Sequence, residues 1–130
     1  MIAFEVTGTP APKGSMKAFN GKFRPVVTHD NKRTKPWQNA IRRACKRAMA
    51  RHSVELYDGA VAVSATFTFT RPKSVKREHA QTKPDLDKLQ RVIGDALEGV
   101  LLTNDSRIVE WQVRKQYGEP EGVRVEVRAL

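Results

Sequence analysis

The chain has 130 residues, of which 39% are hydrophobic and 29% charged; these values fit a soluble globular protein and exclude an intrinsically disordered chain. No apolar run approaches the roughly 20 residues that cross a bilayer, and the first residues lack the features of a secretory signal. The net charge of +10 lies in residues 1–54, because residues 55–130 carry 12 basic and 12 acidic side chains. This cationic half suits a polyanion, with nucleic acid as the leading candidate, or else only keeps the surface soluble.

The first part of the chain is predicted to be extended. Apolar and polar residues alternate over residues 2–7, which indicates a strand. Two prolines and two glycines in residues 8–15 then interrupt regular structure. The pair Asn20-Gly21 predicts a tight hairpin turn, and Pro25 in the returning arm favours an edge strand.

A basic amphipathic helix is predicted to begin at Pro36, where a missing N–H costs nothing. Its apolar residues recur at steps of three and four: Trp37, Ile41, Ala44, Cys45, Ala48 and Met49. Four basic side chains occupy the opposite face: Arg42, Arg43, Lys46 and Arg47. They lie along a phosphate backbone or form a solvated surface, and the charge asymmetry favours nucleic acid. Cys45, the single cysteine, is expected to pack in the core and points to a reducing, cytoplasmic location.

The rest of the chain predicts one helix and three strands. Alternation over residues 61–69 indicates a strand, and the polar residues 71–83 indicate a loop. A second helix is predicted from Leu86 to Val100. Alternation around 109–113 and 123–127 predicts two closing strands, joined by a hairpin connection. Together these elements predict a mixed α/β (α+β) fold, with residues 1–130 as a single domain, one mainly β sheet of five or six strands and two principal helices.

The chemistry is expected at residues 83–91. Pro84 leaves Asp85 as the N-cap of the second helix and Asp87 in its first turn, so the two carboxylates can converge on one hard cation such as Mg²⁺. A third carboxylate, Asp105, follows the helix and joins them only if the fold brings its loop to the start of the helix or across from it. In the alternative interpretation, the acids cap the helix and offset its dipole.

An ordered set of motifs resembles the RusA-type Holliday-junction resolvases. Three segments carry the resemblance, namely Lys83-Pro84-Asp85-Leu86-Asp87-Lys88-Leu89-Gln90-Arg91, Asp95-Ala96-Leu97 and Asn104-Asp105-Ser106-Arg107-Ile108-Val109. The match is good over residues 82–117 and looser near residues 8–15, in the manner of phage-encoded members. The resemblance implies a small cytoplasmic, nucleoid-associated homodimer that makes paired nicks in four-way DNA junctions with Mg²⁺ or Mn²⁺. No membrane and no small-molecule cofactor are expected.

Position by position, Asp85, Asp87 and Asp105 match the essential carboxylates of that family, which makes them the expected metal ligands. Two positions depart: Asn104 stands where the family often has a first Asp, and Arg91 stands where some members carry Lys. Arginine keeps its charge but does not readily lose a proton, so Arg91 is expected to stabilise the phosphate, with Lys88 as a second candidate. Asp95 and Lys115 also match family positions.

Contacts to the DNA backbone are expected from basic side chains of the first helix and the loops. These are Lys13, Arg42, Arg43, Lys46, Arg47, Arg71, Lys73 and Lys83. The competing hypothesis is a non-catalytic basic nucleic-acid-binding protein, in which the acids only cap a helix.

Overall fold

The structure, a computed structural model, describes residues 1–14, 16–19, 22–25 and 29–130. In that part of the chain the elements follow in the order β1 (Ile2–Thr7), β2 (Met16–Phe19), β3 (Lys22–Pro25), α1 (His29–His52), β4 (Val61–Phe69), α2 (Leu86–Leu97), the short 3₁₀ helix η1 (Asp105–Arg107), β5 (Ile108–Tyr117) and β6 (Gly122–Ala129). The turn predicted at Asn20-Gly21 lies outside the described residues. Of the helices described here, none is long and apolar enough to cross a bilayer.

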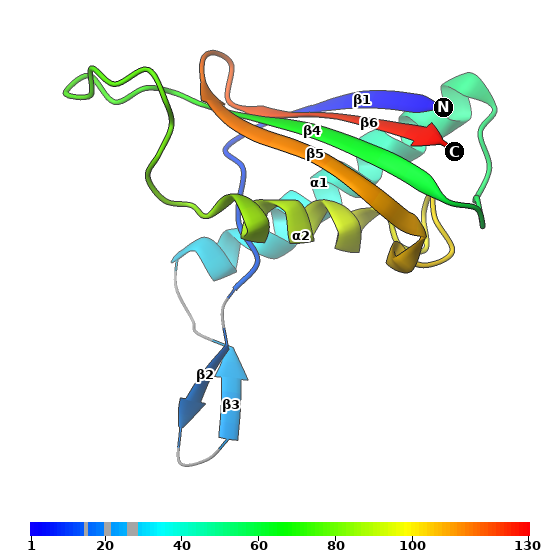
Figure 1. Cartoon of the computed structure of the whole chain (residues 1–130), viewed down its shortest axis with the longest axis horizontal. Helices are drawn as coiled ribbons and strands as arrows, with labels where there is room; N and C mark the ends of the chain where they lie inside the picture. The colour runs from blue at the N-terminus through cyan, green and yellow to red at the C-terminus, as the bar shows by residue number, and fades with distance from the viewer. Residues whose placement is uncertain (15, 20–21, 26–28) are drawn as a thin grey trace.

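The described strands divide between two sheets (Figure 1). One sheet has the order β1-β6-β4-β5, with β6 antiparallel to both β1 and β4, and β5 parallel to β4. Among the described residues, strands β2 and β3 pair with each other and with no other strand. The mixed α+β class is therefore confirmed, whereas the predicted sheet of five or six strands is wrong: four of the described strands form the main sheet, because the β2–β3 hairpin does not join it.

The hairpin predicted between the last two strands is also wrong, because β4 lies between β5 and β6. The connection passes over the end of β4, where the Gly118 N–H donates to the Phe69 carbonyl at 3.0 Å. The parallel pairing of β4 and β5 requires a crossover, which α2 supplies. As a result, α2 runs back against the direction of both strands, and its start lies at the same end of the sheet as the end of β5.

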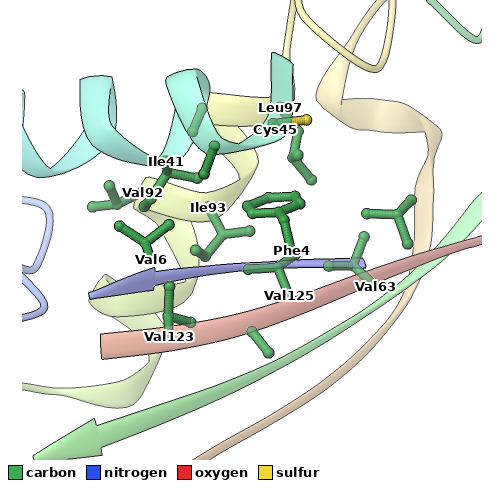
Figure 2. Close-up of a cluster of buried hydrophobic side chains, with 14 of the residues drawn as sticks. Phe4, Val6, Ile41, Cys45, Val63, Val92, Ile93, Leu97, Val123 and Val125 are labelled. Atoms are coloured by element: carbon green, nitrogen blue, oxygen red, sulfur yellow. The ribbon is translucent and has the colours of Figure 1, made fainter. Parts of the chain in front are cut away.

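Both helices pack on one face of the main sheet (Figure 1). Figure 2 shows the buried cluster between them, with Phe4, Val63 and Val125 of the sheet near Ile41 and Cys45 of α1 and Ile93 and Leu97 of α2. Burial of such side chains contributes about 25 cal/mol per Å² of apolar surface removed from water. Cys45 packs here as predicted, and burial raises the pKa of its thiol to about 11.

Helix α1 begins at His29, so the start predicted at Pro36 is wrong. Pro36 lies inside the helix, where a proline removes one backbone hydrogen bond. Residues 29–35 carry no apolar stripe, which is why the periodicity indicated a later start. Tertiary contacts hold these early turns: the Arg33 guanidinium donates to the Thr9 carbonyl at 3.1 Å, and the Thr34 hydroxyl donates to the Pro12 carbonyl at 2.6 Å.

Candidate active site

Asp85 occupies the start of α2 that the sequence predicts. It is the N-cap residue, with an extended backbone (φ −69°, ψ 135°), yet its side chain makes no capping hydrogen bond in the described structure. The carboxylate instead pairs with the ammonium of Lys83 at 3.2 Å and with that of Lys88 at 3.6 Å. Because the Asp85 side chain is 38% exposed, its oxygens remain accessible to a ligand from solvent.

The two lysines also set the charge of this carboxylate. The hydrogen bond from Lys83 holds the pKa of Asp85 below its ordinary value, against an opposing effect of desolvation, and the charges of Lys83 and Lys88 act in the same direction as the hydrogen bond. Asp87, in the first turn of α2, is exposed and offers a second carboxylate. The helix start thus carries hard oxygen donors of the kind that Mg²⁺ and Mn²⁺ bind.

Lys115 contacts the segment that leads into Asp85. Its ammonium donates to the carbonyl of Thr82 at 2.7 Å and to that of Pro84 at 2.9 Å. Lys115 lies near the end of β5, opposite Phe67 of β4. The sequence marks this lysine only as a position of the family it resembles, and its contacts join two segments about thirty residues apart along the chain.

Asp105 lies at the other end of α2. Its backbone N–H donates to a carboxylate oxygen of Glu98, the residue that follows the helix, at 3.2 Å. At about 1.5 Å per residue, roughly 20 Å of helix separates Asp85 from Glu98, and Figure 1 shows the turn before β5 at the end of α2 away from its start. Within one chain, Asp105 therefore does not join Asp85 and Asp87. No group of three or more His, Cys, Asp or Glu side chains suited to a metal ion occurs among the described residues.

The turn that carries Asp105 is held on both sides. Asn104 is the N-cap of η1, and its side-chain oxygen accepts a hydrogen bond from the Ser106 N–H at 2.9 Å. An amide serves as such a cap as well as a carboxylate does, which gives Asn104 a structural role. Arg107 donates to the Asp58 carboxylate at 3.0 Å, and Thr103 also donates to it. These contacts lower the pKa of Asp58, with the Thr103 hydrogen bond as the largest cause.

Arg91 shares a cleft with Asp105, between α2 and the beginning of β5. The cleft has a volume of about 430 Å³, and Lys13, Asp95 and Trp111 also line it. Lys13 pairs with Asp95 at 3.0 Å, so two opposite charges in the cleft already neutralise each other. Spacing by four residues puts Asp87, Arg91 and Asp95 along one face of α2. This face therefore runs from the first turn of the helix to the cleft.

The basic side chains predicted to contact DNA from α1 do not all remain accessible. Arg43, Lys46 and Arg47 are exposed. Arg42 is half-buried, and its guanidinium donates to the carbonyl of Asp95 at 2.9 Å. This contact ties α1 to the last turn of α2, where backbone carbonyls lack partners within the helix. The structure therefore gives Arg42 a helix-packing role that the sequence pattern did not indicate.

The loop cations differ in their surroundings. Arg71 and Lys73 are both exposed, and the Arg71 guanidinium lies 5.2 Å from the centre of the Tyr117 ring. The side chain of Lys83 is 84% exposed although it pairs with Asp85, and that of Lys13 is 48% exposed although it pairs with Asp95. Exposed ion pairs of this kind are weak, so these lysines can exchange partners at little cost.

Comparison with known proteins identifies the family of the chain. The protein-family model described as "Endodeoxyribonuclease RusA" matches residues 6–128, which include the β4-α2-β5 unit and both acidic segments. The uncharacterized protein YqaN of Bacillus subtilis (strain 168) is 30% identical over 146 residues, and the alignment covers 99% of this chain and 96% of that protein. The chain belongs to the RusA endodeoxyribonuclease family.

Proposed function

We propose that the protein is a divalent-metal-dependent endodeoxyribonuclease that resolves four-way DNA junctions in recombination and repair. The observation that carries the proposal is the partly exposed carboxylate of Asp85, with a lowered pKa and no capping hydrogen bond in the described structure, in a member of an endodeoxyribonuclease family. A carboxylate that served only as a helix cap would accept a hydrogen bond from the first turn. We expect the enzyme to act in the cytoplasm, at the nucleoid.

The residues at the start of α2 fit Mg²⁺ or Mn²⁺. Asp85 and Asp87 would hold the ion, since both are oxygen donors that solvent reaches: the side chain of Asp85 is 38% exposed, and Asp87 is exposed. When bound, such an ion lowers the pKa of water and offsets negative charge at the phosphate. Lys83 would move from Asp85 to the DNA backbone, because its side chain is 84% exposed. Lys88 and Arg91 would add positive charge near the scissile phosphate, and Arg91 can contact it in a bidentate manner.

Asp105 would complete the site from a second copy of the chain. Strand β5 is an edge of the main sheet as the described residues form it, and Val109 on it is 62% exposed. Two copies that pair these edges antiparallel bring the beginning of one β5 to the end of the other. Asp105 comes just before the beginning of β5 in one copy. Asp85 of the other copy lies beside the end of its own β5, because Lys115 near that end contacts Pro84. Two symmetric sites suit a junction that receives two symmetric cuts.

DNA would lie across the helical side of the molecule. Arg43, Lys46 and Arg47 on α1 would contact backbone phosphates, which position the substrate without reading its sequence. Lys13, Arg71, Lys73 and Lys83 would extend this contact from the loops.

Cleavage of a labelled four-way junction tests the proposal. We expect Asp85→Asn to reduce Mg²⁺-dependent nicking at least about 100-fold while junction binding in EDTA is unchanged or tighter, because the lost charge is a metal ligand that also repels phosphate. Glu78→Gln is the matched control, since it neutralises an exposed carboxylate in the loop before α2, and it should nick like the wild type. If the wild-type protein binds junctions but nicks them with neither Mg²⁺ nor Mn²⁺, it is a non-catalytic binding protein.

A further inference from the structure

One half-buried lysine, Lys115, contacts the backbone of the candidate active site, and no proposed catalytic step requires it. The Lys115 ammonium donates to two backbone carbonyls, those of Thr82 and Pro84, at 2.7 and 2.9 Å. Hydrogen bonds from a charged donor are roughly twice as strong as neutral ones. Because both acceptors are backbone atoms, the contact fixes the path of the chain immediately before Asp85.

That segment has few other fixed points. Residues 70–85 connect β4 to α2 without a helix or strand in the described structure. Among the described residues, the backbone–backbone hydrogen bonds within this connection are local, from the Val75 N–H to the Pro72 carbonyl and from the Gln81 N–H to the His79 carbonyl. A longer-range contact, from the Thr70 N–H to the Glu121 carboxylate at 2.8 Å, lies at the far end of the connection from Asp85. Asp85 does not use its own side chain as a cap. A contact from Lys115 of β5 to the backbone therefore holds the start of α2 in place of the side-chain capping hydrogen bond that an N-cap residue usually makes.

Lys115 is a suitable anchor because its own backbone is rigid. It pairs with Phe67 of β4, whose side chain is fully buried. It also differs from the two lysines that bind the Asp85 carboxylate itself, Lys83 and Lys88. A cation that reaches Asp85 would compete with those two, whereas the contact of Lys115 with the backbone would be unaffected.

We infer that Lys115 is the positioning residue of the candidate active site: it holds residues 82–84 so that the Asp85 carboxylate faces solvent and an incoming metal ion. The inference rests on the proposed function, since the carboxylate that Lys115 positions is the proposed metal ligand. Residues that orient metal ligands from outside the first coordination sphere typically change metal affinity by about 10- to 100-fold when they are mutated.

Lys115→Met tests this role, because it keeps the apolar stem and removes the ammonium. We expect the Mn²⁺ concentration for half-maximal nicking to rise about 10-fold or more, with junction binding in EDTA unchanged. Amide hydrogen exchange at residues 82–86 should become faster, while exchange in β4 stays as in the wild type. Lys115→Arg, which retains the charge and donors, should recover part of the Mn²⁺ affinity. Lys76→Met, an exposed lysine of the same connection, is the control and should match the wild type.

The role of Lys115 and the proposed function can be disproved separately. A wild-type protein that nicks normally, combined with a Lys115→Met variant whose Mn²⁺ dependence and exchange at residues 82–86 are unchanged, would overturn the role of Lys115 alone. A wild-type protein that never nicks would overturn the proposed function, and with it the catalytic part of this inference. If Lys115→Met does not fold, Lys115→Gln replaces it, because glutamine is polar but lacks the charged donor. A wild-type Mn²⁺ dependence together with a wild-type exchange rate at residues 82–86 in that variant would overturn the role of Lys115.

Discussion

The backbone N–H of Asp105 donates a hydrogen bond of 3.2 Å to the carboxylate of Glu98, and this contact fixes Asp105 at the end of α2 that is remote from Asp85. Glu98 itself follows the last residue of the helix. The side chains that resemble the family's essential carboxylates therefore belong to two separate places in one chain. A site that uses all of them needs two chains.

Arg42 and Arg43 should differ in their effect on stability. Arg42→Met removes the hydrogen bond to the Asp95 carbonyl at the end of α2, and we expect the free energy of unfolding in urea to fall by about 1–3 kcal/mol. The loss should lie towards the lower value, because the Nε of Arg42 is buried without a hydrogen-bond partner in the described structure. Arg43→Met, on the exposed face of the same helix, should stay within about 0.5 kcal/mol of the wild type. Equal losses would contradict the packing role of Arg42.

The exposed basic residues of α1 should determine the salt dependence of DNA binding. Replacing Arg43, Lys46 and Arg47 by Gln should reduce the slope of log K against log salt by roughly 2 to 3, since each phosphate contact contributes about 0.9. The control replaces Arg114, Arg124 and Arg128 by Gln, which removes the same charge from the opposite, polar face of the sheet. We expect that variant to change the slope by less than about 1. If the slope changes equally in the two variants, DNA does not bind preferentially to the exposed basic face of α1.

The pH dependence of Asp85 follows from its lysine neighbours. The pKa of Asp85 in the folded protein is lowered from 3.8, so its ionisation stabilises the fold above that value, and this contribution is lost as the pH falls through the lowered pKa. Lys83→Met removes the largest cause, and we expect the Asp85 titration followed by carboxyl-resonance NMR to move up towards 3.8. The free energy of unfolding should then change less steeply below pH 4 than in the wild type. Lys76→Met should leave the titration in place, and a shift as large as that of Lys83→Met would contradict the assigned cause.

Local periodicity was sufficient to predict several elements of the fold. The alternation over residues 61–69 matches β4 along its length, and the apolar stripe of α2 is buried from Leu89 to Leu97. The order of the strands could not be predicted, because short connections usually join neighbours and nothing in residues 118–122 reveals that β4 lies between β5 and β6. The early start of α1 was missed because contacts with residues 9 and 12, rather than an apolar stripe, hold its first turns.

The candidate site divides in the same way. Asp85 and Asp87 could be placed at the start of a helix from the sequence, because Pro84 comes directly before them and the apolar stripe of α2 directly after them. The position of Asp105 depends on the packing of α2 against β5, and that of Lys115 depends on the parallel register of β4 and β5, which no local pattern encodes. Arg42 illustrates a further limit, since the sequence distinguishes a basic helix face but not which arginine reaches the end of a neighbouring helix.

Mixed dimers of two inactive variants test the shared site most directly. Asp85→Asn and Asp105→Asn chains with different affinity tags would be co-expressed and purified through both tags. If the site is shared, one of its two copies in this heterodimer receives the intact Asp105 of the first chain and the intact Asp85 and Asp87 of the second. A heterodimer of Asp85→Asn with Asp87→Asn is the control, because each of its sites lacks one ligand.

The measurement is nicking of a four-way junction labelled on each strand in turn, with Mg²⁺ and at one salt concentration. We predict that the Asp85→Asn/Asp105→Asn heterodimer nicks single strands at about half the wild-type rate, since one of two sites is intact, and makes few paired cuts. Each variant alone and the control heterodimer should be inactive. If the Asp85→Asn/Asp105→Asn heterodimer is as inactive as the control heterodimer, the site is not shared between two chains.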